Sequence, residues 1–337
     1  MRKIRIGSVG LGRLGMRHAE NIAGRIANAE LVALCDVDGR KLNDTADRLG
    51  VTLRFESYDK MIASPDIDAV VLASPSGLHT GQIAAALDAG KHVFSEKPLG
   101  ITIEECRIAE KAVEAHPDMV FMLGFMRRFD ESYRYAYRKV KAGEIGKPIL
   151  FRSYSQDPEK FIDGAIAFAE HSGGQFLDMA VHDIDLARWF TGSEPRTVYA
   201  AGGCYAHQEF ARYGDGDNVS CLMKFADDCM VFLFAGRTAP HGYNVETEII
   251  GTEGILRIAS VPQKNLVEIL DTSGVRRECS ENFLERFETA YLNEIQEFVE
   301  CIVMDRKPEV SVYDGTRVSE IAHACKASFE TGELIHF

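Results

Sequence analysis

The chain has 337 residues, of which 46% are hydrophobic and 26% charged, and its formal net charge is −13. This length exceeds what one compact core usually holds and predicts two domains. The acidic balance argues against nucleic-acid binding, which depends on basic surface patches, and no stretch approaches the roughly 18 uninterrupted apolar residues of a membrane span.

Short apolar runs alternate with helical patterns in the first third of the chain. The runs are nearly continuous, as expected of strands buried on both faces, and strict alternation implies right-handed crossovers and a parallel sheet. The expected strands are residues 4–9, 30–35, 69–72, 91–94 and 119–124, and the expected helices are 15–26, 39–49, 79–89 and 103–115. The pattern predicts an α/β domain over residues 1–125.

Longer strands with turn signals follow residue 125. The expected strands are 148–154, 198–204, 218–225, 229–236, 244–250, 254–258 and 266–271, and the expected helices are 130–142, 176–190, 285–304 and 314–331. Residues 126–305 are therefore predicted to form an α+β domain on a large, mostly antiparallel open sheet with helices on one face. Residues 306–337 form a separate C-terminal segment in this division.

The uncovered face of that sheet is expected to include Met223, Phe225, Val231 and Phe232. Bare faces of this kind usually pair with a copy of the same chain, so we expect a homo-oligomer. Eight scattered cysteines without a C-x-x-C pair and the absence of a signal-like leader are typical of a reducing compartment. We therefore expect a cytoplasmic protein.

The stretch FLDMAVHDIDLARWF, residues 176–190, has an unusual distribution of polar side chains for a helix. At 100° per residue, Asp178, His182, Asp185 and Trp189 share one narrow stripe with apolar residues on both flanks. A stripe of titratable groups between apolar flanks predicts the lining of a cleft. The alternative is a His–Asp pair that is buried and satisfied within the fold.

Residues 10–15 read GLGRLG, directly after an expected strand and at the start of an expected helix. In this context the motif indicates a Rossmann-type dinucleotide site. Gly10 permits the tight turn, Gly12 allows close approach of a pyrophosphate, and Gly15 allows helix–sheet packing. Arg13 and Leu14 lie at the helix N-terminus, which favours bound anions.

Asp36 ends the second expected strand, about twenty residues beyond the last motif glycine. An acid at this position binds the adenosine ribose hydroxyls and repels a 2′-phosphate, which favours NAD over NADP. Arg40 is the nearby basic residue that could instead accommodate a 2′-phosphate. The alternative role of Asp36 is to cap a turn.

Two further segments follow the next strands, SPSGLH (74–79) and SEKPLG (95–100). Both lie where the carboxyl ends of parallel strands bind ligands. The cofactor contacts expected from these segments come from Ser74, Pro75, His79, Glu96 and Lys97. Lys97 is also a candidate donor to a substrate oxygen, and its alternative is a surface lysine paired with Glu96.

Alcohol oxidation by NAD requires a base as well as a hydride acceptor, and histidine is the usual base near neutral pH. His182 lies one helical turn from Asp178, which could orient its ring. Together, GLGRLG, SPSGLH, SEKPLG, GFMRRFD and SGGQFLDMAVHDIDLARWFTG resemble the glucose–fructose oxidoreductase/inositol dehydrogenase (Gfo/Idh/MocA) superfamily over nearly the whole chain. The segments RSYSQDP and HGYNVETEIIGTEG are similar to its bacterial inositol dehydrogenases.

The resemblance implies oxidation of a myo- or scyllo-inositol hydroxyl, with His182 as general base, Lys97 assisting, and Asp178 binding the reacting region. It implies Arg127, Asp157 and Tyr243 as further substrate contacts, no metal, a homotetramer formed through open sheets, and a final helix that returns to the nucleotide domain. Arg127 or Arg128 could instead pair with Asp130, and Tyr243 could be a strand-edge aromatic. Alternative functions are a pyranose or polyol dehydrogenase of the same superfamily, an NAD-dependent glycosidase, and a nucleotide-sensing regulator.

Overall fold

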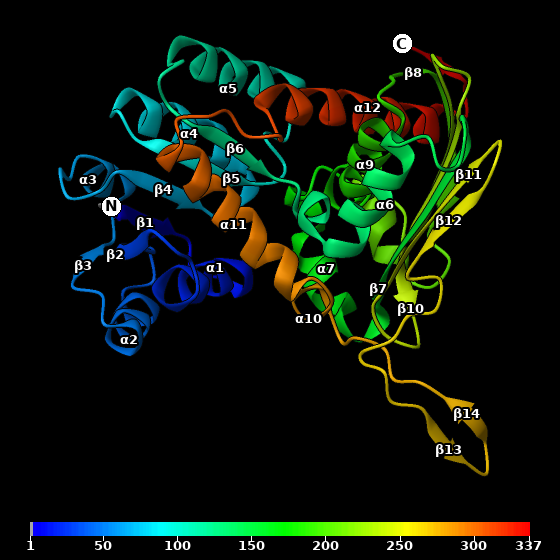
Figure 1. Cartoon of the computed structure of the whole chain (residues 1–337), viewed down its shortest axis with the longest axis horizontal. Coiled ribbons are helices and arrows are strands. Elements are labelled where there is room, and N and C mark those ends of the chain that lie inside the picture. Colours follow the sequence, from blue (N-terminus) through cyan, green and yellow to red (C-terminus); the bar gives the residue numbers. More distant parts are fainter. Residues whose placement is uncertain (1–2) are drawn as a thin grey trace. The chain divides into compact units, whose positions relative to one another are not determined.

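A computed structural model describes residues 3–337 of the chain, which form two compact units (Figure 1). The first unit contains residues 3–129 and Thr289–Ser319, and the second contains Asp130–Glu288 and Glu320–Phe337. Each unit is therefore built from two separate parts of the chain. Among residues 3–337, every cysteine is a free thiol, and no helix is both long enough and apolar enough for a transmembrane segment.

The first unit is built on a parallel sheet, which confirms the predicted α/β fold. Within residues 3–129 this sheet has six strands, in the order β3-β2-β1-β4-β5-β6. The strands are β1 (Ile4–Val9), β2 (Ala29–Cys35), β3 (Leu53–Phe55), β4 (Ala69–Leu72), β5 (His92–Glu96) and β6 (Phe121–Gly124). The helices are α1 (Arg13–Gly24), α2 (Gly39–Leu49), α3 (Tyr58–Ile62), α4 (His79–Asp88) and α5 (Ile103–Ala115), with short helices η1 (Ser76–Leu78) and η2 (Met126–Phe129).

Local sequence signals set several helix ends in this unit. The Asp38 side chain accepts from the amides of Arg40 and Lys41 at the start of α2, and Gly50 ends that helix in the left-handed conformation. Thr102 and Glu105 form a capping box at the start of α5. β3 and α3 were not predicted, because neither exceeds five residues.

Helix α11 (Glu288–Val303) belongs almost entirely to the first unit, beginning at Thr289. The predicted division had placed this segment in the second domain. Its Phe298 packs on Phe94 of β5, with ring centroids 5.9 Å apart. The boundary between the units then falls within α12 (Val312–Thr331), after Ser319.

The second unit is built on a mostly antiparallel sheet with helices on one face, as predicted (Figure 1). In residues 130–337 its seven strands run in the order β12-β11-β7-β10-β9-β8-β15, and only the β7–β10 pair is parallel. The strands are β7 (Pro148–Pro158), β8 (Pro195–Gly203), β9 (Asn218–Phe225), β10 (Met230–Ala239), β11 (Asn244–Gly251), β12 (Ile255–Ile258) and β15 (Ile335–His336). The helices are α6 (Glu131–Lys141), α7 (Ile162–Phe168), α8 (Gln175–Asp178), α9 (Val181–Thr191) and α10 (Phe283–Arg286), with short helices η3 (Glu159–Phe161), η4 (Ala169–His171) and η5 (Gln208–Tyr213). Strands β13 (Ile269–Asp271) and β14 (Gly274–Arg276) form a separate hairpin.

The prediction of which strand residues face outward was wrong at Met223, Phe225 and Val231. These three side chains are at most 1% exposed and face the helices. Phe232 is half-buried on the uncovered face. The strands carry apolar residues on both faces, so alternation alone does not tell which face the helices cover.

One row of paired residues crosses the uncovered face of the sheet and is called the outer row below. It consists of Arg257, Glu248, Arg152, Phe232, Leu222 and Tyr199 on successive strands from β12 to β8. Half of the outer row is charged and the other half is apolar. The uncovered face is therefore amphipathic along its width.

The predicted helix over residues 176–190 is broken in the structure. Helix α8 ends at Asp178 and α9 begins at Val181. The amides of Met179 and Ala180 both bond to the Gln175 carbonyl oxygen, and the second of these bonds spans five residues, which widens the turn between the helices. Asp178 and His182 therefore lie on two different helices and do not share one continuous stripe.

Candidate functional site

The glycine loop between β1 and α1 shows three different steric requirements. Gly10 has a φ of +82°, and a Cβ there would lie 2.6 Å from the Ala73 carbonyl oxygen. A Cβ at Gly15 would lie 1.9 Å from the Gly10 carbonyl oxygen, whereas a Cβ at Gly12 meets nothing within 4 Å. Gly10 and Gly15 are therefore required by the fold itself, and Gly12 is not.

Asp36 is bound to the glycine loop and to its own turn. Its Oδ2 accepts from the Leu11 amide at 2.7 Å, and its Oδ1 accepts from the Asp38 amide at 2.9 Å. The turn-capping role is thus present, and two carboxylate oxygens retain lone pairs for a further donor. Lys41 Nζ lies 3.9 Å from Oδ2, while the Arg40 side chain is 92% exposed and lies beside Asp44. Lys41, not Arg40, is therefore the basic side chain beside Asp36.

His79 joins the two loops that follow β4 and β5. The side chain is buried, with Nδ1 2.8 Å from the Pro98 carbonyl oxygen and Nε2 2.9 Å from the Ser74 carbonyl oxygen. Burial lowers the pKa of His79, against the opposing effect of the two carbonyls. Both ring nitrogens are engaged within the protein, so this side chain fixes loops that also contain Pro75 and Lys97.

Lys97 directly follows β5. The alternative of a surface ion pair with Glu96 does not fit the structure, because the Glu96 side chain is buried. Glu96 is 6% exposed, and its Oε1 lies 2.7 Å from His18 Nε2. The Glu96 side chain is thus turned into the first unit. Lys97 itself is half-buried.

Arg127 and Arg128 lie in η2, at the end of the first unit's first segment, and both are buried. Arg128 pairs with Asp314 at 3.2 Å. Asp130 pairs with Arg286 at 2.9 Å.

An arginine that was not predicted connects two predicted acids in the second unit. Arg237, on β10, donates to Asp178 Oδ2 at 2.7 Å, and its Nη1 lies 4.0 Å from Asp157 Oδ2. Its Nε also donates to Gln175 Oε1 at 3.2 Å. The structure therefore brings Asp157 and Asp178 together around one buried cation.

The acids around Arg237 stabilise the charged form of its guanidinium group. Burial alone lowers the pKa of Arg237, but the carboxylates of Asp178, Asp157 and Asp215 outweigh this effect and raise it. The Arg237 side chain is 6% exposed, against 19% for Asp178 and 38% for Asp157. The arginine is thus sealed in the fold while both acids reach solvent, where they can accept hydrogen bonds from a hydroxylated ligand.

His182 lies in the first turn of α9 and is 9% exposed. The next residue, Asp183, was also missed as a candidate, although its role is clear in the structure. Its two carboxylate oxygens accept from Ser153 Oγ at 2.5 Å and from Ser155 Oγ at 2.6 Å. These bonds tie the start of α9 to β7 and fix the backbone that carries His182.

Tyr243 is 6% exposed and packs edge-on against Phe287, with ring centroids 6.2 Å apart. It lines a hollow of the second unit that also contains Lys264, Ser280 and Arg286. The expected substrate residues of this unit thus belong to two groups, one around Arg237 and one around Tyr243.

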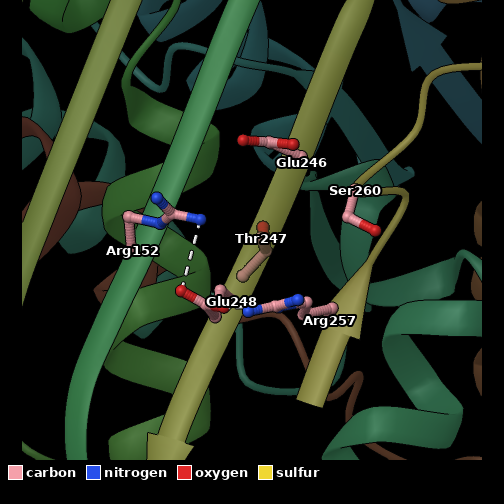
Figure 2. A pocket seen from close by; sticks show the side chains of 6 residues that line it. All are labelled: Arg152, Glu246, Thr247, Glu248, Arg257 and Ser260. Carbon is pink, nitrogen blue, oxygen red and sulfur yellow. Dashed lines mark hydrogen bonds and ion pairs between the residues drawn. The ribbon is translucent and has the colours of Figure 1, made fainter. Parts of the chain in front are cut away.

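A second charged hollow, of about 280 Å³, lies on the uncovered sheet face (Figure 2). Its lining residues are Arg152, Glu246, Thr247, Glu248, Arg257 and Ser260. Glu248 pairs with both arginines, at 3.2 Å and 2.6 Å, so its charge is compensated. Burial raises the pKa of Glu246, and Glu248 adds to this effect while Arg152 opposes it. These pairs resemble a surface ion-pair network more than a reactive centre.

Comparisons with known proteins agree with both units. Residues 4–125 match the family described as "Oxidoreductase family, NAD-binding Rossmann fold", and residues 133–257 match the "GFO/IDH/MocA C-terminal domain". The chain is 34% identical to scyllo-inositol 2-dehydrogenase (NAD(+)) of Bacillus subtilis, across 98% of this chain and 95% of that protein.

Two solved structures are similar over almost their full length. Scyllo-inositol dehydrogenase from Lactobacillus casei, with bound NAD(H) and scyllo-inositol, is 46% identical with a TM-score of 0.96, covering 99% of each chain. Myo-inositol 2-dehydrogenase from Lactobacillus plantarum is 39% identical with a TM-score of 0.97, covering 100% of each chain.

Proposed function

The chain belongs to the GFO/IDH/MocA family of NAD-dependent oxidoreductases, and we propose that it oxidises one secondary hydroxyl of an inositol to a ketone. The observation that carries the substrate class is the pair of solvent-accessible acids held by the buried Arg237. An inositol presents a ring of neutral hydroxyls, so it is recognised by hydrogen bonds rather than by apolar area or charge pairing. The names of the similar dehydrogenases support the same substrate class.

In the proposed mechanism His182 removes the hydroxyl proton while the carbon-bound hydrogen leaves as hydride. NAD supplies the hydride acceptor when it is bound, held by Gly10, Gly12, Gly15 and Asp36. Lys97 donates to the reacting oxygen and stabilises the negative charge that develops there. The proton ends on the imidazole, and the two electrons leave with the hydride.

The remaining proposed residues hold the ring. Asp178 accepts from a hydroxyl of the reacting region, and Asp157 accepts from another hydroxyl. Arg127 and Tyr243 supply donors to further ring oxygens. The fixed orientation of Asp178 and Asp157 toward Arg237 supports this division, because a held acid accepts with less loss of side-chain entropy.

The test is an initial-rate assay that follows nicotinamide absorbance with myo-inositol, scyllo-inositol, D-chiro-inositol, glucose and xylose. Reduction of NAD by one inositol, with glucose weaker, is the expected result. Reduction by a sugar and by no inositol would retain the cofactor site and discard the substrate. NADH formation stoichiometric with the substrate consumed would exclude the glycosidase alternative.

The role of His182 has its own test. His182→Ala should leave NADH binding unchanged and reduce kcat by about 10²–10⁴-fold, the usual contribution of general-base catalysis. His171→Ala is a suitable control, because His171 is an exposed histidine of the same unit. Unchanged turnover in His182→Ala would remove this residue from the mechanism.

We also propose that the chain forms a homotetramer through the uncovered sheet face. The apolar half of the outer row exposes Leu222 and Tyr199 by 52% and 47%, and a face of this kind is suited to self-association. Leu222→Glu should therefore reduce the mass measured by light scattering at micromolar concentration. A wild-type monomer in that measurement would contradict the assembly.

A further inference from the structure

Three buried titratable side chains meet beside the carboxyl end of β5 in the first unit. They are His18 of α1, Glu96 of β5 and Glu294 of α11, with side chains 0%, 8% and 0% exposed. His18 Nε2 lies 2.7 Å from Glu96 Oε1 and 3.9 Å from Glu294 Oε1. None of these three side chains is a reacting group in the proposed mechanism.

The spacing within this cluster identifies a hydrogen bond rather than a metal site. One ligand atom from each residue lies within 4.8 Å of the others, a spacing that a cation could bridge. Ligand atoms around a tetrahedral zinc are about 3.3 Å apart, since zinc–ligand bonds are about 2.0 Å. The 2.7 Å between His18 Nε2 and Glu96 Oε1 is shorter and is a normal hydrogen-bond length.

The surroundings make this hydrogen bond the main polar contact of the His18 ring. His18 Nδ1 and both carboxylate oxygens of Glu294 lack hydrogen-bond partners among residues 3–337. The ring lies edge-on to Phe94 and Tyr291, with centroids 5.5 Å and 5.9 Å away. Burial raises the pKa of Glu294 well above its ordinary value, and Glu96 adds to this effect. The raised pKa disfavours a charge on Glu294, so the His18 ring interacts mainly with the nearer Glu96, whose Oε1 lies within hydrogen-bond distance of Nε2.

The bond between His18 and Glu96 reaches the backbone of Lys97. Glu96 Oε2 accepts from the Lys97 amide at 3.3 Å. The carboxylate lies against Gly124, where a Cβ would stand 3.1 Å from Oε2. On the other side of Lys97, the Pro98 carbonyl is held by His79. The Lys97 amide is therefore held by Glu96, which His18 contacts, and the Pro98 carbonyl, one residue further along the chain, is held by His79.

We propose that His18 is a positioning residue for Lys97, acting through the Glu96 carboxylate that binds the Lys97 amide. This inference rests on the proposed function, because it concerns how the lysine of that mechanism is held. Loss of the His18 donor leaves a buried carboxylate with one bond fewer, and Glu96 then reorients toward solvent. A displacement of about 1 Å at a reacting group lowers a rate by up to roughly 10²-fold.

The test is a double-mutant cycle of His18→Leu and Lys97→Met, with kcat as the readout. We expect His18→Leu to lower kcat by about 10–100-fold in the wild-type background and by less than about 2-fold in the Lys97→Met background. Equal factors in both backgrounds would overturn the proposal, since His18 would then act independently of Lys97. A Lys97→Met variant with wild-type kcat would contradict the proposed function as well.

His18→Gln keeps a donor near Glu96 and should recover part of the lost rate, which a purely space-filling role of the ring would not explain. Each variant is compared with His116→Leu, a surface histidine of the same unit that lies beside Asp88. Thermal unfolding and NADH titration are measured for all variants. If His18→Leu does not fold, the cycle is run with His18→Asn, and the same comparison of backgrounds decides the outcome.

Discussion

Replacing Arg237 with methionine removes the cation between Asp178 and Asp157 while keeping a long side chain. Two unit charges 4.0 Å apart, as Arg237 and Asp157 are, interact by about 4 kcal/mol at an effective dielectric constant of 20 and by about 1 kcal/mol in water. Breaking a fully buried pair costs about 3–5 kcal/mol. Because both acids reach solvent, we expect a stability loss of about 2–3 kcal/mol in denaturant unfolding.

The catalytic consequence of the same substitution can be separated from the loss of stability. Without the cation, the ionised forms of Asp178 and Asp157 are disfavoured, so the acidic limb of the kcat/KM profile should move to higher pH. Arg237→Lys keeps the charge but not the planar donor arrangement, so it should give an intermediate profile. The rate measurement uses the inositol that the substrate panel identifies.

Arg188→Met is the matched control for Arg237→Met. Arg188 is 8% exposed and pairs at 2.6 Å with Glu194, which is 36% exposed, so its environment is close to that of Arg237. We expect a similar loss of stability with little change in kcat/KM. An Arg237→Met variant with the same stability loss and an unchanged pH profile would refute a role of the cluster in substrate binding.

Three further predictions concern the first unit. Gly12→Ala should leave stability unchanged but weaken NADH binding at least about 10-fold. Gly15→Ala should instead destabilise the fold by about 1–3 kcal/mol, because its Cβ would meet the Gly10 carbonyl oxygen at 1.9 Å. Calorimetric titration measures the effect on binding, and thermal unfolding measures the effect on stability. Asp36→Ala should weaken NAD more than NADP, and a fixed ratio of the two affinities would reject the ribose assignment. Glu294 has a raised pKa in the fold, so its stabilising contribution is complete below its unfolded pKa of about 4.3 and is lost as pH rises. The stability of Glu294→Gln relative to wild type should therefore increase with pH. A stability difference between the two proteins that stays constant from pH 5 to 8 would contradict a buried acid.

The sequence predicted the α/β fold of the first unit because its signals are local. Apolar runs mark buried strands, and Gly10, Gly12 and Gly15 mark the turn into the first helix. Helix α11 was assigned to the wrong region because its contacts are remote. The amide of Ala27 donates to the side chain of Gln296, for example, and no local pattern records such a bond.

The candidate site was predicted in part for the same reason. Motif spacing drew attention to Asp178 and His182, but Arg237 lies 59 residues from Asp178 and follows an ordinary strand pattern. The break between α8 and α9 was also not predictable from periodicity, since an apolar, helix-favouring stretch runs through it. Only the tertiary fold shows that Ser153 and Ser155 of β7 hold Asp183.

The division of the first unit into two chain segments has a consequence for protein synthesis. About 160 residues separate Phe129 from Thr289. At about 5–20 residues per second, α11 is made roughly 8–30 s after the parallel sheet it covers. During that interval Phe94 lacks Phe298, and His18 lacks Tyr291. A nascent chain therefore presents an unfinished apolar surface, and a minimal cofactor-binding fragment has to join residues 3–129 to Thr289–Ser319 through a linker rather than end at Phe129.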